Sequence, residues 1–228
     1  MHCRFPLLFL LFCLLSPVDL AAHAAERVDY CFDGDTLKLG NGHVVRLSGI
    51  DTPERAHGDR QSQYYAEESY RLLQRLVLGK NVSLRSISNR PGRATGGLPT
   101  DRHKRLVAEV LLPDGTSVNE RMVAEGAAFV YPHKEHPREY TLKLLRLQQE
   151  AMATGRGFWK RLLSDPIVDR SYVGNRNSLR FFPADCPETK RINPRNRVNF
   201  STLEEAFSTG YAPARACPFW PEQRAPSE

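Results

Sequence analysis

Two acidic motifs in the first quarter of the chain carry side chains that could do chemistry. They are Asp33-Gly34-Asp35-Thr36 and Asp51-Thr52-Pro53-Glu54, and Arg46 lies between them. Two carboxylates with a backbone carbonyl form a hard oxygen site for Ca²⁺ or Mg²⁺, and an arginine beside such a cation can grip a phosphodiester. A further carboxylate can take a proton from water. The combination indicates metal-assisted phosphodiester hydrolysis, although Asp-Gly-Asp-Thr alone is more often an ordinary turn.

A β-hairpin is expected to join the first motif to Arg46. Asn41-Gly42 lies between two apolar-rich runs, and Asn-Gly is typical of a two-residue type I′ turn, which needs positive φ at both positions. With this turn at the centre, Asp35 lies opposite Ser48. Leu37 lies opposite Arg46 in the same register. Since side chains alternate along a strand, the register predicts that Asp35 and Arg46 share one face.

Asp51 also has to reach that face. Strict alternation along the second strand would put Asp51 on the opposite side of the sheet. We therefore expect the strand to end or twist at Gly49, which brings the turn with Thr52 and Glu54 next to Asp35.

Hydrophobic periodicity outlines the remaining elements. It predicts helices over residues 63–78, 117–125 and 136–154, and strands over 28–32, 81–87, 105–112 and 127–131. In the last helix, Leu142 and Leu145 with Gln149 or Ala153 are expected to form the apolar stripe.

These motifs, with others further along, resemble the staphylococcal (micrococcal) nuclease, or thermonuclease, family. The resemblance spans roughly Glu26–Leu163 and is carried by Asp33–Thr36, Arg46-Leu47, Asp51–Glu54, Thr100-Asp101, Arg105, Asp114-Gly115, Val118–Glu120, Gly126–Ala128 and Gly157–Trp159. It implies an α+β, mainly β fold over residues 25–163, in which a five-stranded OB-type barrel carries three helices. The face of such a barrel commonly binds nucleic acid.

The family resemblance also implies the site. The implied roles are Ca²⁺ ligands for Asp35, Asp51 and the backbone carbonyl of Thr52, general base or water-orienting group for Glu54, and phosphate-binding residues for Arg46 and Arg105. By the same resemblance the enzyme would cleave DNA and RNA and leave 3′-phosphate ends. The alternative is a catalytically weak OB module that only binds nucleic acid. A structural cell-envelope protein is a further alternative.

Further substrate contacts are expected from the segment before Arg105 and from one later aromatic residue. The candidates are Asp101, Arg102, His103 and Tyr131. His103 stands where the family usually has tyrosine, and Lys104 replaces a glycine. Neither departure removes an implied metal ligand, so we expect activity with altered affinity.

The N-terminus predicts export. Arg4 precedes the apolar run of residues 6–15, and Ala22-His23-Ala24 is an A-x-A-like cleavage site, so residues 1–24 are typical of a signal peptide. We expect a secreted or periplasmic monomer without stable membrane association after cleavage. The 32 lysines and arginines against 26 acidic residues give a net charge of +6, which suits a nucleic-acid partner.

The rest of the chain reads as a linker over 164–170, a small cysteine-containing α/β module over 171–221 and a tail over 222–228. About Asn175–Pro218, the module resembles the metal-binding domain at the start of the Ada DNA-repair protein, which holds zinc with four cysteines. Only Cys186 and Cys217 remain of those four, too few for a closed zinc site. The resemblance places them close together, so in an oxidising compartment we expect a disulfide in place of the metal. Cys31 is expected to stay reduced and buried.

Overall fold

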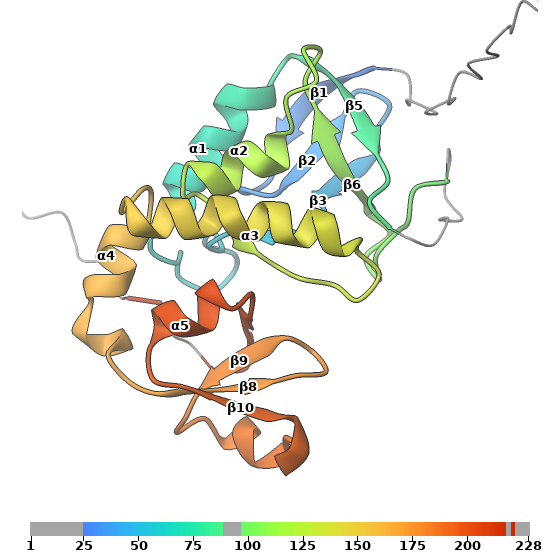
Figure 1. Ribbon diagram of the computed structural model, residues 1–228. Helices are drawn as coiled ribbons and strands as arrows, with labels where there is room; N and C mark the ends of the chain where they lie inside the picture. Colours follow the sequence, from blue (N-terminus) through green and yellow to red (C-terminus); the bar gives the residue numbers. More distant parts are fainter. Residues whose placement is uncertain (1–24, 89–96, 218–219, 222–228) are drawn as a thin grey trace, which may run out of the picture.

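The first half of the molecule is a closed barrel. The computed structural model describes residues 25–88, 97–217 and 220–221. Within them the barrel order is β1-β2-β3-β6-β5, with β3 and β6 parallel and the other neighbours antiparallel (Figure 1). Its strands are β1 (Glu26–Cys31), β2 (Thr36–Leu39), β3 (Val44–Leu47), β5 (Asn81–Arg85) and β6 (Leu106–Leu111). The predicted five-stranded OB-type barrel is confirmed.

The barrel core is made by alternate apolar side chains of these strands. Leu106, Ala108 and Val110 of β6 are buried, as predicted. Cys31 at the end of β1 is a free, fully buried thiol, also as predicted. The same alternation points the other side chains of each strand away from the barrel core, where some of them, such as Glu109, are covered by neighbouring elements.

The predicted register of the first hairpin is wrong by one residue. Thr36 pairs with Arg46, and Leu37 pairs with Val45. The Leu39 N–H donates to the His43 carbonyl at 2.9 Å, so the loop between them has three residues instead of two. Only its last residue, Gly42, has positive φ, at 89°. With this three-residue loop, each residue of β2 pairs one position earlier in β3 than predicted. The side chain of Leu37 lies in the barrel core.

The expected change of direction at Gly49 is present. Gly49 has φ of 78°, and a Cβ there would lie 2.8 Å from Cε1 of Tyr140, so both backbone conformation and packing require glycine. The chain then forms β4 (Ile50–Asp51), which leaves the barrel and pairs with β7 (Phe129–Val130) as a separate two-stranded sheet.

Three helices cover the barrel, as Figure 1 shows. They are α1 (Ala66–Val77), α2 (Val118–Ala124) and α3 (Arg138–Ala153). The predicted start of α2 is confirmed, because the Ser117 hydroxyl accepts a hydrogen bond from the Glu120 N–H.

The apolar stripe predicted for α3 is wrong. The residues of α3 that face the interior are Tyr140, Leu144, Gln148, Ala151 and Met152. Leu142 is 39% exposed. The four leucines of this helix, at positions 142, 144, 145 and 147, lie on several of its sides, so the hydrophobic pattern was compatible with more than one buried face.

The C-terminal module follows a fourth helix, α4 (Trp159–Ser164), and a short 3₁₀ helix, η2 (Pro166–Val168), where η marks 3₁₀ helices. It contains a four-stranded sheet in the order β10-β8-β9-β11. Its elements are β8 (Tyr172–Asn175), β9 (Arg180–Pro183), η3 (Pro187–Arg191), η4 (Pro194–Asn196), β10 (Arg197–Phe200), α5 (Leu203–Ser208) and β11 (Ala212–Pro213). The predicted disulfide between Cys186 and Cys217 is confirmed, with Cα atoms 6.2 Å apart.

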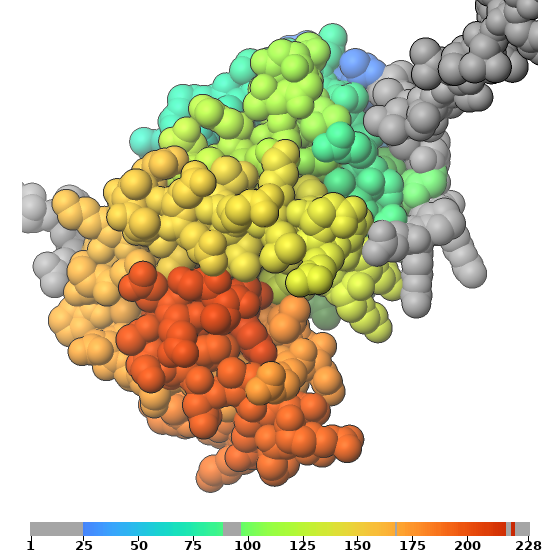
Figure 2. All heavy atoms as spheres, viewed as in Figure 1, coloured from blue at the N-terminus to red at the C-terminus, as the bar shows by residue number. Residues whose placement is uncertain are grey.

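The module and the barrel domain share one aromatic cluster. Trp159 and Phe129 from the first part each pack edge-on against Phe207, with ring centroids 4.9 and 5.7 Å apart. Figure 2 shows the module, in orange and red, lying directly against α3 in yellow. The segment expected as a linker, residues 164–170, is largely taken up by the end of α4 and by η2. The module therefore packs directly against the barrel domain.

The predicted signal peptide and C-terminal tail lie outside the described residues. Among the helices of the described part, none is both long and apolar enough to cross a membrane.

Gln148 joins the two parts and generates a stability prediction. Its Oε1 accepts from the Val130 N–H at 2.7 Å, and its Nε2 donates to the Phe207 carbonyl at 2.9 Å, all buried. In Gln148→Ala both backbone groups lose their partner, so urea denaturation should show a loss of about 2–5 kcal/mol in the free energy of unfolding.

The neighbouring Gln149 is the matched control. Its Nε2 donates to the Ser208 carbonyl at 2.8 Å, but at the exposed surface, where water can replace it. We expect Gln149→Ala to cost less than about 1 kcal/mol. Equal losses in the two variants would contradict the role given to Gln148.

Candidate active site

The loop between β1 and β2 presents Asp35 to the site. The Asp35 N–H donates to Oδ1 of Asp33 at 2.9 Å, which forms a tight Asx turn. A Cβ at Gly34 would lie 2.8 Å from the Ser69 Cβ and 2.9 Å from the Thr52 Oγ1. Glycine therefore lets the first acidic motif pack directly against the second.

Arg46 of β3 lies between the two buried carboxylates. Its Nη1 is 2.7 Å from Oδ2 of Asp35, and its Nη2 is 2.6 Å from Oδ1 of Asp51. The Thr52 hydroxyl donates to the same Asp35 oxygen at 3.3 Å. The structure thus brings together four of the predicted site residues within direct contact.

The two carboxyl groups are held in an environment that disfavours their charge. Burial raises the pKa of Asp35 to about 7, with the guanidinium of Arg46 acting against this shift. Burial raises the pKa of Asp51 to about 6, and the charge of Asp35 adds to the shift. The guanidinium of Arg46, even with that of Arg215 near Asp51, is therefore too little positive charge to offset the burial of two carboxylates.

This donor set fits a hard divalent cation. Asp35, Asp51 and Thr52 are all buried, and their carboxylate and carbonyl oxygens are the ligands that Ca²⁺ and Mg²⁺ prefer. The described part of the chain contains no group of three or more acidic, histidine or cysteine side chains that could hold a metal. A cation here would therefore complete its coordination with water or substrate oxygens.

Glu54 lies at the rim of this site. Its side chain is 52% exposed, and its Oε1 is 3.1 Å from Nη2 of Arg215. Its backbone is fixed by Gln63, whose Oε1 accepts from the Glu54 N–H at 2.7 Å and whose N–H donates to the Glu54 carbonyl at 2.9 Å. A fixed and accessible carboxylate can act on a water molecule.

Arg105 reaches the site from the turn before β6. Its Nε and Nη2 are each 2.8 Å from Oδ2 of Asp101, and its Nη1 is 3.3 Å from the Thr36 hydroxyl. Asp101 also accepts from the backbone N–H groups of Arg105 and His103. In this structure Asp101 stabilises the turn and orients Arg105. The sequence had instead predicted that Asp101 contacts the substrate.

The other predicted contacts line an open cleft of about 540 Å³. Arg102 and His103 are exposed on one wall, where the Arg102 Nε lies 3.0 Å from the His103 Nε2. Tyr131 lines the same cleft and has the Arg180 guanidinium 3.5 Å from its ring centroid. One face of the ring is therefore covered by the C-terminal module.

Sequence reasoning missed two residues of this site. Gln63 gave no local signal, because its role depends on two hydrogen bonds to the Glu54 backbone, one from its own N–H and one to its side-chain Oε1. Arg215 is far away in sequence, yet its Nη2 lies 3.4 and 3.5 Å from the two carboxylate oxygens of Asp51. Only its position two residues before Cys217 could have pointed to a fixed location.

Comparison with known proteins assigns the barrel domain. A family model described as staphylococcal nuclease homologue matches residues 44–161. The chain belongs to the staphylococcal nuclease family. Its site residues Arg46, Asp51 and Arg105 lie inside the matched range.

Individual relatives of the nuclease family agree with this assignment. An uncharacterized endonuclease of Escherichia coli is 32% identical over 151 residues, which cover 65% of this chain and 84% of that protein. The probable endonuclease LCL3 of Komagataella phaffii is 31% identical over 128 residues, 54% of this chain. This chain spans about half of that protein, 51%. Endonuclease YhcR of Bacillus subtilis is 25% identical over 220 residues, which cover 84% of this chain and 17% of that protein.

The nuclease-family match ends before the C-terminal module begins. None of these matches supports the resemblance of the module to the Ada metal-binding domain. The module is closed by the Cys186–Cys217 disulfide.

The raised pKa of Asp35 yields a test of the nuclease site. A carboxyl group whose folded-state pKa exceeds its unfolded value stabilises the fold below the unfolded pKa, here 3.8, and loses this contribution as the pH rises through about 7. Asp35→Asn keeps a neutral side chain at every pH. The melting temperature of the metal-free variant should therefore exceed that of the unmodified protein at pH 8 and differ little at pH 4.

Asp29→Asn provides the control, because the Asp29 carboxylate is exposed on β1, so its loss should leave the melting temperature nearly unchanged at both pH values. Thermal melts followed by circular dichroism measure both variants. A lower melting temperature of Asp35→Asn at pH 8 would contradict the electrostatic description of the site.

Proposed function

We propose that this protein is an exported Ca²⁺-dependent endonuclease that hydrolyses DNA, RNA or both. The observation that carries the proposal is the placement of Arg46 between two buried carboxylates, beside a cleft that Arg105 also lines. Family membership supports phosphodiester hydrolysis, and the relatives are named endonucleases.

The proposed metal ligands are Asp35, Asp51 and the carbonyl of Thr52. A Ca²⁺ ion held there would supply positive charge to the phosphate oxygens of the substrate. Burial of the two carboxylates supports this role, because their charged forms need a stronger counter-charge than one guanidinium provides.

The other residues act on water and on the phosphate. Glu54 is exposed and held by Gln63, so it can accept a proton from an attacking water or orient it. Arg46 and Arg105 can donate to the oxygens of the scissile phosphate as negative charge grows in the transition state. Cleavage of the 5′-O–P bond would leave 3′-phosphate ends, as the family resemblance implies.

Export is part of the proposal. The pattern of residues 1–24 is typical of a signal peptide, and a disulfide is favoured in an oxidising compartment such as the periplasm or the exterior. Ca²⁺ is abundant in both places.

The main alternative is a nucleic-acid-binding OB module that has lost catalysis. That alternative would be expected where metal ligands or arginines are missing. All six implied residues are present and lie near one another, which supports the enzyme over this alternative.

Two substitutions test the enzyme. We expect Glu54→Gln and Arg105→Ala each to lower turnover at least about 100-fold, because both groups act in the transition state. Release of acid-soluble nucleotides from DNA and RNA measures turnover, and circular dichroism checks the fold. Arg75→Ala, which removes an exposed arginine of α1, should retain full turnover. Near-normal turnover of Glu54→Gln would refute its assignment.

The metal requirement is tested on the unmodified protein. Activity should disappear in a chelator and return with Ca²⁺, and mass spectrometry of the products should find 3′-phosphate ends. Full activity in the chelator would refute the metal role, whereas binding without any cleavage would favour the alternative.

A further inference from the structure

Arg215 is the one described residue of the C-terminal module that forms ion pairs with the acidic residues of the site. Its Nη2 is 3.1 Å from Oε1 of Glu54 and 3.4 Å from Oδ1 of Asp51. It lines the 540 Å³ cleft with Arg46 and Arg105, and it also lines a second cavity of about 190 Å³ beside Glu54. Its guanidinium therefore lies where two adjoining cavities meet.

The backbone around Arg215 is fixed on both sides. Before it, β11 pairs with β9, and the Ala214 N–H donates to the Phe181 carbonyl at 2.9 Å. After it, Cys217 is bonded to Cys186. The segment that carries Arg215 is thus tied to the module at both ends, so its side chain starts from a defined position.

The module itself is fixed against the cleft. Arg180 of β9 donates to the Pro132 carbonyl at 3.2 Å and covers the ring of Tyr131. Phe181, the next residue, packs against Phe207 in the aromatic cluster shared with the barrel domain. Arg215 therefore belongs to the wall of the cleft in the folded protein.

Arg215 is also the most accessible guanidinium of the three at this site. Its side chain is 63% exposed, compared with 12% for Arg46 and 28% for Arg105. Each of the other two has a close carboxylate partner, at 2.6–2.8 Å, whereas the contacts of Arg215 to Asp51 are 3.4 and 3.5 Å long. Its shorter contact, 3.1 Å to Glu54, joins two side chains that are both more than half exposed, and such a pair contributes little to stability, so the guanidinium can exchange Glu54 for a phosphate at little cost.

On the basis of the proposed function, we infer that Arg215 is a third phosphate-binding arginine, supplied by the C-terminal module. It contacts a backbone phosphate of the nucleic acid next to the scissile one, where the substrate passes from one cavity to the other. A guanidinium binds phosphate oxygens through two parallel hydrogen bonds, which a flexible surface lysine cannot reproduce. The disulfide holds Arg215 in place for this contact.

Binding of a short fluorescein-labelled single-stranded oligodeoxynucleotide tests the inference. Fluorescence anisotropy is measured in a chelator, so that no cleavage is needed, and over a series of salt concentrations. Arg215→Ala should weaken binding about tenfold and lower the slope of log K against log salt by about 0.7, the value for one lost phosphate contact on a single strand.

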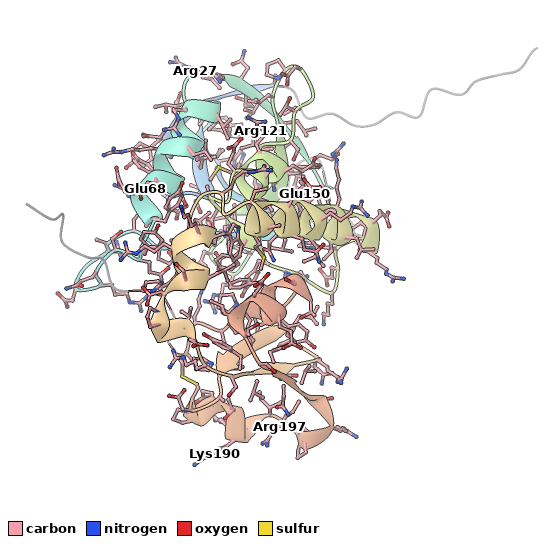
Figure 3. All side chains as sticks on the ribbon, turned by 60° about the vertical axis from the view of Figure 1, so that its left-hand side comes forward. Arg27, Glu68, Arg121, Glu150, Lys190 and Arg197 are labelled. Carbon is pink, nitrogen blue, oxygen red and sulfur yellow. A yellow bond between two sulfur atoms is a disulfide. The ribbon has the colours of Figure 1, made fainter. Side chains whose placement is uncertain are left out.

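Arg195→Ala is the matched control. Arg195 is an exposed arginine of η4 in the same module, so its loss changes the net charge equally. Lys190 and Arg197, which flank η4 in sequence, lie at the end of the module away from the barrel domain (Figure 3). Arg195→Ala should bind as the unmodified protein does.

A second arm tests the disulfide. The double substitution Cys186→Ser and Cys217→Ser should weaken binding as Arg215→Ala does and cause no further loss in the Arg215→Ala background. Near-UV circular dichroism reports whether the aromatic cluster stays packed.

The outcomes separate the inference from the proposed function. Equal affinity of Arg215→Ala and the unmodified protein overturns the inference alone, as do equal losses in Arg215→Ala and Arg195→Ala. Tighter binding by Arg215→Ala also overturns it, since Arg215 would then be blocking the site. If the unmodified protein binds no nucleic acid even at low salt, the proposed function fails and the inference falls with it.

Discussion

The arrangement of this site depends on the burial of two carboxylates around one guanidinium. Taking Asp35 and Asp51 out of water is costly, and Arg46 offsets only part of that cost. The carboxylates are held in these buried positions by tight packing of the backbone. Gly34 packs against Thr52, and Gly49 packs against the ring of Tyr140. Under the proposed function, a bound cation would relieve the repulsion that folding creates between these carboxylates.

The helices contribute to the site by holding the turn that carries Asp51. The Ser48 carbonyl, which precedes Gly49, accepts from Nδ2 of Asn119 at 2.8 Å and from the hydroxyl of Tyr140 at 3.1 Å. Asn119 comes from α2 and Tyr140 from α3, and both are buried. A turn that leaves the barrel is thus fixed by two elements distant in sequence.

The sequence predicted which side chains would lie close together better than it predicted the register of the strands that carry them. Asp-Gly-Asp-Thr alone is more often an ordinary turn, but its combination with Asp-Thr-Pro-Glu and Arg46 indicated one site, and the break at Gly49 followed from the alternation of strand side chains. The hairpin register failed because Asn41-Gly42 is compatible with loops of two or three residues, and the choice between them is made by burial of Leu37. The predicted stripe of α3 was wrong because leucines lie on several sides of this helix, and the hydrogen bonds that favour burial of Gln148 are not visible in a hydrophobic pattern.

Lys104 illustrates how a departure from the family pattern can be tolerated. It adopts φ of 63°, in the left-handed region that favours glycine, the residue the family usually has there. Asp101 compensates, because its carboxylate accepts from the backbone of the turn on both sides of Lys104, at His103 and Arg105. The Asp101 carboxylate therefore both stabilises the unfavourable backbone conformation of Lys104 and orients the side chain of Arg105.

The C-terminal module covers apolar side chains of the barrel domain. Phe158 and Trp159 are fully buried, and Trp159 packs against Phe207 of the module. Phe129 of β7 does the same, and β7 is the partner of β4, which ends at Asp51. Without the module, the rings of Trp159 and Phe129 would be exposed to water. They lie beside the β4–β7 pair, which carries the proposed metal ligand Asp51. Packing of the module and geometry of the site are therefore coupled through β7, independently of any contact made by Arg215.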